Sequence, residues 1–369
     1  MASVELGREL FIELLQVAIG SRAVLSRIPS ERDWERIYRT ALKQSVVGLL
    51  FSAVEKLNAG DSSLKPGTSL FYQWLGEVTQ IEAQNQRMNE AAVELCRMFR
   101  KDGIRSCVLK GQGLARLYPE PLRRQSGDID LWVEGIRERT LRYLKGKGYE
   151  TGAVVIHHVD AKIIEGVESE IHFLPIWMYN PWFNRRLQEF FRTCQEEQFA
   201  NYEDGAGFCY PTAEFNIVYC LTHLFHHLLD EGIGLRQVVD YYFVLANEEL
   251  KDKSDKIKVT ETLRTLGLLK FAGAMMWVLQ EICGMPSDWL ICRPDERRGK
   301  RLLAEIMETG NMGHYDERYQ KGTAESALHR NLRKSQRWMK LAKEYPSEVV
   351  CIPVWKMWHW AWRKRNGYS

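Results

Sequence analysis

Apolar residues recur at helical spacing through the first hundred residues of the chain. Residues 4–19 predict one amphipathic helix, and Ser30 with Asp33 fits a capping box that opens a second helix ending near Asn58. A longer helix is predicted from about Ser69 to Lys101. Its apolar face consists of residues three or four positions apart or a multiple of that spacing, namely Leu75, Val78, Ile81, Met88, Ala92, Leu95 and Phe99. This helical stretch contains no pattern that indicates chemistry.

The pattern changes at Ile104, where short apolar runs replace the helical repeat. Strands are predicted over residues 107–109, 128–133, 153–157, 161–165 and 167–173. Short helices are predicted over residues 114–117 and 136–146. Glu165-Gly166 is the expected hairpin turn between the last two strands.

From Pro181 onward the spacing is helical again. The predicted helices cover residues 182–198, 213–229, 236–249, 256–266, 271–283, 300–309, 324–344 and 354–365. The chain therefore predicts an α+β protein in which a small mixed sheet is flanked by helical N-terminal and C-terminal regions. We expect a helical N-terminal region (1–103), an α/β core (104–200) and a helical C-terminal domain (201–369).

Composition narrows the class of protein. The 369 residues are 45% hydrophobic, which is ordinary for a packed globular protein and excludes overall disorder. A net charge of +3 implies no global attraction to nucleic acid, so a long nucleic acid is not a favoured partner. The eight cysteines include no Cys-x-x-Cys pair, and the N-terminal residues lack the basic region of a signal peptide. We expect a cytoplasmic protein without a membrane span.

Candidate chemistry is concentrated at Asp128 and Asp130. Side chains alternate faces along a strand, so both carboxylates should lie on one face while Ile129 and Leu131 enter the core. Adjacent carboxylates repel unless a positive charge lies between them, and Mg²⁺ accepts such oxygen ligands together with substrate phosphates. A bare Asp-x-Asp also fits a surface strand with two solvated aspartates, but this pair is embedded in an apolar run.

A second polar face is predicted on the strand over residues 167–173. Glu168, Glu170 and His172 share one face of it, while the apolar residues share the other. Glu168 is interpreted as solvated. If this strand lies beside the strand of Asp128 and Asp130, Glu170 completes a cluster of three carboxylates.

Basic residues and glycines precede the aspartates. Lys110, Arg123 and Arg124 could neutralise phosphate charge, and the two-glycine loop at 111–113 could let backbone N–H groups approach it. Lys110 also fits a solvated lysine. For the arginine pair, we expect one functional and one solvated side chain.

Taken together, these motifs resemble the DNA polymerase β-like nucleotidyltransferase superfamily, and most of all its bacterial, largely uncharacterised branch. The matching residues are Lys110-Gly111, Tyr118-Pro119, Arg123 or Arg124, Asp128-Ile129-Asp130-Leu131, Gly148-Tyr149, Glu170-Ile171-His172, His223, Gly232–Gly234, Arg236 and Asp240. The resemblance covers roughly residues 105–245.

The resemblance implies transfer of a nucleoside monophosphate from a nucleoside triphosphate, with ATP the expected donor, to an acceptor hydroxyl. The acceptor would be a small molecule, a protein side chain or an RNA end. Asp128 and Asp130 would bind Mg²⁺ in a two-metal site, and Glu170 would be the third carboxylate, as ligand or base. The residues expected to bind the nucleotide are Lys110, Gly111, Gln112, Arg123, Arg124 and His172.

One departure from the superfamily keeps a second interpretation open. The loop reads Gly111-Gln112-Gly113, whereas the superfamily usually has Gly-Ser or Gly-Gly, so a hydroxyl donor to the phosphates is missing. This loop favours a non-catalytic nucleotide-binding or antitoxin-like regulatory module, while the complete carboxylate set favours an enzyme. A purely structural protein would instead have the two aspartates far from Glu170.

Histidines form another constellation, His223, His226 and His227, on one predicted helix. The i, i+4 pair could bind a metal ion, but the sequence is not His-Glu-x-x-His, and a helix-face histidine cluster is the favoured interpretation. A further hypothesis is that His223 or Arg236 helps to close the substrate cleft.

The C-terminal run Trp355–Arg365 interleaves tryptophans with cations. Such a segment could stack on bases or lie at a membrane surface. The favoured interpretation is a docking helix whose tryptophans pack on the protein while the cations face water.

Overall fold

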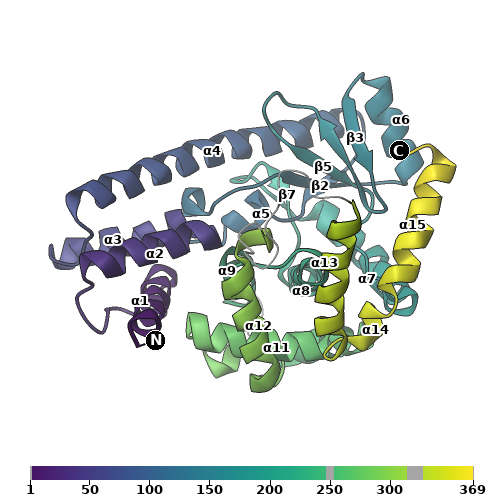
Figure 1. The fold of residues 1–369 in the computed structure, drawn as a ribbon. Helices are drawn as coiled ribbons and strands as arrows, with labels where there is room; N and C mark the ends of the chain where they lie inside the picture. The colour runs from purple at the N-terminus through teal and green to yellow at the C-terminus, as the bar shows by residue number, and fades with distance from the viewer. Residues whose placement is uncertain (1, 247–252, 314–326, 369) are drawn as a thin grey trace.

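A five-stranded mixed sheet lies beside one end of a long helix in the computed structural model, which describes residues 2–246, 253–313 and 327–368 (Figure 1). The strands are β1 Ser106–Val108, β2 Ile129–Val133, β3 Glu150–Val154, β4 His158–Lys162 and β5 Ser169–His172, in the order β1-β2-β5-β4-β3. Among these five strands, β2 and β5 are the one pair that is parallel. The predicted α+β class is confirmed.

The parallel pairing of β2 with β5 sets the register of the polar residues. Asp130 lies opposite Glu170, and Ile129 lies opposite Ser169. Helix α6 Arg137–Gly146 and the β3–β4 hairpin supply the crossover between the two strands. The cluster of three carboxylates required these two strands to be adjacent, and they are.

The N-terminal region consists of α1 Ala2–Ile19, α2 Glu31–Gln44, α3 Val47–Gly60 and α4 Thr68–Lys101. The predicted capping box is confirmed, because the Ser30 hydroxyl accepts from the Asp33 N–H and the Asp33 carboxylate accepts from the Ser30 N–H. The single helix expected up to Asn58 is wrong. Ser45 adopts a left-handed φ of 55°, which ends α2 and turns the chain into α3.

The C-terminal part of the chain is helical, as predicted. Its helices are α7 Pro181–Ala200, α8 Ala213–Asp230, α9 Leu235–Ala246, α10 Lys253–Thr265, α11 Leu269–Cys283, α12 Glu296–Thr309, α13 Ala327–Ala342, α14 Pro346–Val349 and α15 Ile352–Asn366. The ends of the helices predicted at 236–249 and 324–344 lie partly outside the described residues. Connecting elements are α5 Gln112–Ala115, η1 Pro121–Arg123, η3 Ser287–Trp289 and η4 Asn311–Gly313.

Two strand predictions need correction. β3 and β4 each begin three residues before the predicted 153–157 and 161–165. Residues 163–168 connect β4 to β5, so the expected two-residue turn at Glu165-Gly166 is wrong. Gly166 takes a φ of 69° within this connection. A small second sheet, β6 Tyr202–Glu203 with β7 Phe208–Cys209, was not predicted, because two-residue strands carry no periodic signal.

Alternation along β2 divides the core in two. Ile129, Leu131 and Val133 join a buried cluster with the second half of α4. Trp132 points to the other face of the sheet. There its ring centroid lies 4.7 Å from the ring centroid of Phe199 on α7. Asp130 shares that face with Trp132, so its carboxylate looks toward the C-terminal helices rather than toward α4.

Helix α15 runs along the side of the molecule that carries the sheet (Figure 1), and tryptophans on one of its faces make the contacts. Trp355 stacks on Trp177 with centroids 3.7 Å apart, and Trp362 lies over the guanidinium of Arg137. Trp358 and Trp360 are 50% and 61% exposed. The inner face of α15 therefore packs on the protein as predicted for a docking helix, whereas Trp358 and Trp360 on its other face do not. Among the described residues, no helix combines the length and apolar character needed to cross a membrane.

We predict that Trp355→Ala lowers the free energy of unfolding by about 3 kcal/mol, because a large packed aromatic leaves a cavity. Trp360→Ala, on the exposed face of the same helix, should change it by no more than about 0.5 kcal/mol. Urea unfolding of both variants measures the difference. Equal effects would show that the inner face of α15 does not hold the helix in place.

Candidate functional site

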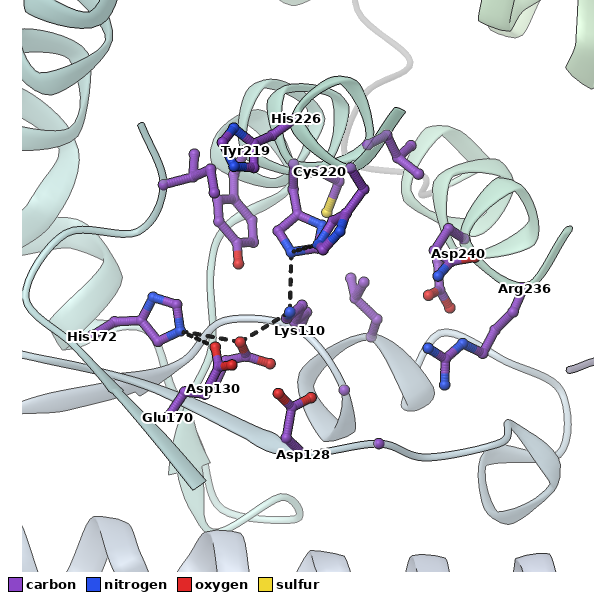
Figure 2. Close-up of a pocket in the computed structure, with 18 of the residues that line it drawn as sticks. Lys110, Asp128, Asp130, Glu170, His172, Tyr219, Cys220, His226, Arg236 and Asp240 are labelled. Atoms are coloured by element: carbon purple, nitrogen blue, oxygen red, sulfur yellow. Dashed lines mark hydrogen bonds and ion pairs between the residues drawn. The ribbon is translucent and has the colours of Figure 1, made fainter. Parts of the chain in front are cut away.

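A pocket of about 340 Å³ lies between the sheet and helices α8 and α9 (Figure 2). Its floor carries Asp128, Asp130 and Glu170, and its walls include histidines and arginines together with apolar and acidic side chains. The polar face of β2 and β5 thus opens into the pocket, while the opposite face packs on α4.

The three carboxylates come together as the strand pairing requires. Asp130 is 1% exposed and lies opposite Glu170 in the parallel ladder. Asp128 directly precedes β2 and lines the same pocket, and Glu168 remains exposed outside it. The pocket holds the two aspartates and Glu170, and Glu168 is the neighbouring carboxylate that it excludes.

Two basic side chains compensate this negative charge. Lys110 places its Nζ 3.0 Å from Asp130 Oδ1. Burial lowers the pKa of Lys110, but the charges of Asp130, Asp128 and Glu170 outweigh burial and raise that pKa above its ordinary value. The ammonium group is therefore charged inside the pocket.

His172 is the second basic group of the carboxylate cluster. Its Nε2 lies 3.1 Å from Asp130 Oδ1 and 3.2 Å from Glu170 Oε2. Burial lowers the pKa of His172, but hydrogen bonds to the two carboxylates raise it to about 9. Burial raises the pKa of Glu170, and the hydrogen bond from His172 reverses this shift and lowers it.

One oxygen of the carboxylate cluster is buried without a partner among the described residues. It is Asp130 Oδ2, which accepts no hydrogen bond from them. A buried, unpaired carboxylate oxygen is costly, and a hard cation with oxygen ligands would relieve that cost. Asp130, Glu170 and His172 offer ligand atoms within 4.8 Å of one another. The donor set thus fits a divalent cation.

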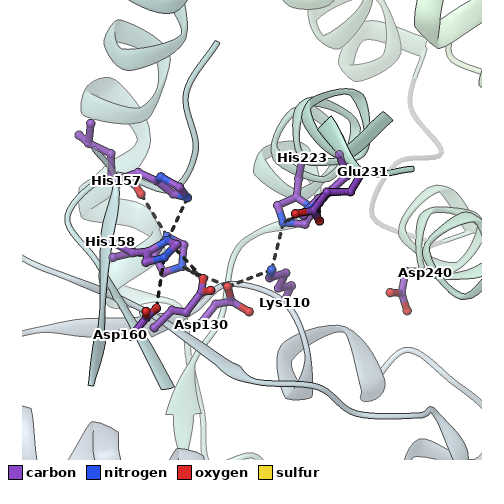
Figure 3. Close-up of polar contacts among 12 residues, drawn as sticks. Lys110, Asp130, His157, His158, Asp160, His223, Glu231 and Asp240 are labelled. Atoms are coloured by element: carbon purple, nitrogen blue, oxygen red, sulfur yellow. Dashed lines mark hydrogen bonds and ion pairs between the residues drawn. The ribbon is translucent and has the colours of Figure 1, made fainter. Parts of the chain in front are cut away.

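Two adjacent histidines, His157 and His158, lie beside the carboxylate cluster (Figure 3). Trp177 Nε1 donates to His157 Nδ1, and His157 Nε2 lies 3.0 Å from His158 Nδ1. His158 Nδ1 in turn lies 3.3 Å from Glu170 Oε2. Burial lowers the pKa of both histidines, that of His158 to about 4, so both rings are neutral.

His157 and His158 belong to the site but were not predicted from the sequence. The pairing of β4 with β5 places His158 opposite His172. A correct strand register would therefore have predicted this contact. The predicted strand began three residues too late and did not include His158.

Helix α8 forms the wall above Lys110. The Lys110 ammonium can only donate, so His223 Nε2, 3.0 Å away, accepts its hydrogen bond. His227 Nε2 lies 3.1 Å from the same nitrogen of His223. No group of three metal-ligand candidates among the described residues includes either histidine. Their contacts orient Lys110.

Asp240 lies on the far side of the pocket (Figure 2) and belongs to a buried ion pair with Arg124. Arg124 donates two hydrogen bonds to Asp240, at 2.7 and 2.8 Å, and Tyr118 donates a third. Burial raises the pKa of Asp240, but the charge of Arg124 outweighs burial and lowers it. Arg236 also lines the pocket and donates to the backbone oxygen of Gln125.

Two of the predicted nucleotide-binding side chains lie outside the pocket lining. Arg123 pairs with Glu82 and Glu55 on α4 and α3, and Gln112 donates to Asn89 on α4. Gly111 does line the pocket, with a φ of 56°. A Cβ atom added at Gly111 would lie 3.3 Å from the backbone oxygen of Asp128. The loop therefore passes so close to the strand that glycine is favoured.

Comparison with known families identifies one match. The model of a family described as "Uncharacterised nucleotidyltransferase" matches residues 30–284. This range is more than half of the chain and contains every residue of the pocket. No curated protein and no solved structure matches the chain significantly.

We predict that Asp240→Ala lowers the free energy of unfolding by about 3–5 kcal/mol, because the Arg124 charge is left buried and unpaired. The control Glu150→Ala breaks an exposed pair with Lys162 and should cost no more than about 1 kcal/mol. Guanidinium unfolding measures both. A loss as small as that of the control would contradict a structural role for the buried pair.

Proposed function

The chain belongs to the uncharacterised nucleotidyltransferase family, and we propose that it transfers a nucleoside monophosphate from a nucleoside triphosphate to an acceptor hydroxyl, with a divalent cation in the pocket. ATP is the expected donor and Mg²⁺ the expected cation. The pocket between β2, β5 and α8 is the proposed site.

The observation that carries the proposal is the carboxylate cluster. Asp128, Asp130 and Glu170 converge from adjacent parallel strands on one pocket, and an oxygen of Asp130 has no partner. Buried acidic groups that converge in a cleft point to a functional site, because a protein without use for them would replace or pair them.

The cation would be held by Asp128, Asp130 and Glu170. A bound Mg²⁺ would stabilise negative charge on the attacking and leaving oxygens of an in-line displacement. The Glu170 side chain is more exposed than those of Asp130 and His172. It is therefore the side chain best placed to act either as a ligand or as the base for the acceptor hydroxyl.

Phosphate charge would be neutralised by Lys110, which His223 orients toward the carboxylates. Gly111 places backbone close to Asp128 without a side chain between them. Arg236 supplies a second positive charge on the α9 side of the pocket. Arg124 serves a different purpose, since its charge is already matched by Asp240.

The acceptor is best sought among small molecules and proteins. A net charge of +3 over 369 residues gives no broad positive field for a long nucleic acid. An RNA end remains within the proposal, because a single hydroxyl near the cluster is all that the reaction requires.

The test is a thermal-shift assay with each nucleoside triphosphate, with and without Mg²⁺. A ligand that binds only the folded chain at 100 times its Kd stabilises it by about 2.7 kcal/mol. We expect a Mg²⁺-dependent rise in Tm with one triphosphate, and its loss in Asp128→Asn/Asp130→Asn. The control Glu168→Gln removes an exposed carboxylate of the connection to β5 and should retain the shift.

A triphosphate labelled at the α-phosphate then reports transfer to candidate acceptors. Binding without transfer to any acceptor class would favour the non-catalytic nucleotide-binding module. The absence of a shift with every triphosphate would contradict nucleotide binding by the isolated chain.

A further inference from the structure

The hydrogen bonds of His172 define which of its nitrogens faces the carboxylates. Nδ1 lies 3.3 Å from the backbone oxygen of Leu174, which can only accept, so Nδ1 carries a proton. The neutral ring therefore has its lone pair on Nε2. That nitrogen points at Asp130 Oδ1 and Glu170 Oε2, which are also acceptors. A positive species must lie among these three atoms.

A second imidazole presents the same situation to Glu170. Trp177 Nε1 is a donor only, so His157 Nδ1 accepts and its Nε2 carries the proton. His157 then donates to His158 Nδ1. This Nδ1 has no proton of its own, yet it lies 3.3 Å from Glu170 Oε2. Glu170 is thus approached by acceptor nitrogens from two strands.

A proton on His172 Nε2 satisfies only part of this set. It would supply hydrogen bonds to one oxygen of Asp130 and one of Glu170, but Asp130 Oδ2 would stay buried without a partner. Lys110 already donates to Asp130 Oδ1 and to His223, and it has no contact with Oδ2. A metal ion with several open positions can engage more of these acceptors than one proton can.

The chemistry of the donors discriminates between metals. Mg²⁺ prefers oxygen ligands and gives up its waters reluctantly, whereas imidazole nitrogen suits first-row transition ions. Metal-ligating histidines typically donate their other N–H to a backbone carbonyl or carboxylate, which is what His172 does with Leu174. Asp130 and His172 are 1% and 2% exposed, so a cation bound by both exchanges water ligands for protein ligands, which Mg²⁺ does reluctantly.

We propose that Asp130, Glu170 and His172 bind a first-row transition ion such as Mn²⁺, with His172 Nε2 as a ligand, in preference to Mg²⁺. The inference deepens the proposed function and shares its pocket, because it names the cation next to Glu170. It leaves Asp128 free to bind a second cation, such as the Mg²⁺ of the proposed function.

The experiment titrates the metal-free, full-length protein with Mn²⁺ and follows the electron paramagnetic resonance signal of the free ion, which binding removes. We expect Mn²⁺ to bind without nucleotide and to resist displacement by a tenfold excess of Mg²⁺. Pulsed measurements on bound Mn²⁺ should show coupling to the ¹⁴N nucleus of an imidazole. His172→Gln should abolish the coupling and weaken binding about 10-fold or more.

The matched control is His226→Gln, which removes another buried imidazole from the same pocket outside the ligand set. It should retain both Mn²⁺ affinity and nitrogen coupling. A Tm measured on each metal-free variant shows that it is folded. Bound Mn²⁺ without nitrogen coupling, nitrogen coupling that persists in His172→Gln, or ready displacement by Mg²⁺ would overturn the proposal, as would a folded wild-type chain that binds no Mn²⁺.

These outcomes are separate from those of the proposed function. Nitrogen-coupled Mn²⁺ in a chain that binds no triphosphate would support the metal site and contradict nucleotide transfer. Triphosphate binding supported by Mg²⁺, without any nitrogen-coupled Mn²⁺, would support the proposed function and contradict the metal site.

Discussion

The parallel pairing of β2 with β5 is the constraint on which the site depends. In a parallel ladder, opposed residues project to the same face, so Asp130 and Glu170 share the surface that looks toward α8. The alternate residues of β2 enter the core beneath α4, which makes a shift by one position incompatible with burial. The hydrophobic core therefore holds the acidic residues in register, although it touches none of their carboxylates.

Charge compensation is built around that pair from different directions. Lys110 arrives from the loop after β1 and His172 from β5 itself. Each reaches an oxygen of Asp130 or Glu170, yet Asp130 Oδ2 is left without a partner. The pocket is neither a neutral ion-pair network nor an open acidic surface. It is a partly compensated cluster, and such a cluster favours binding of a further cation.

Support for the cluster extends to the end of the chain. Helix α15 places Trp355 on Trp177, and Trp177 determines the tautomer of His157 by donating to its Nδ1. The tautomer of His157 in turn determines that of His158, beside Glu170. A C-terminal helix that contributes nothing to the pocket lining thus orients a ring within it. This chain of contacts gives the inner face of α15 a role that is separate from that of its exposed tryptophans.

Local signals in the sequence were sufficient for the elements and for the acidic residues. Helical periodicity placed α4, the capping box placed the start of α2, and the alternation in residues 128–133 identified the strand with Asp130 facing away from the core. Period and capping are properties of neighbouring residues, so no tertiary contact is needed to read them. Their precision ended at turns such as Ser45, whose left-handed backbone has no composition signal.

Tertiary structure alone decided which polar residues meet. Arg123 and Arg124 are adjacent in sequence, yet Arg123 pairs with α3 and α4 while Arg124 lines the pocket and pairs with Asp240. Gln112 follows Gly111 but turns toward α4. His158 reaches Glu170 because β4 pairs with β5 in one particular register. Contacts between residues far apart in the chain depend on strand register and helix packing, and these are set by burial summed over the whole core rather than by any local pattern.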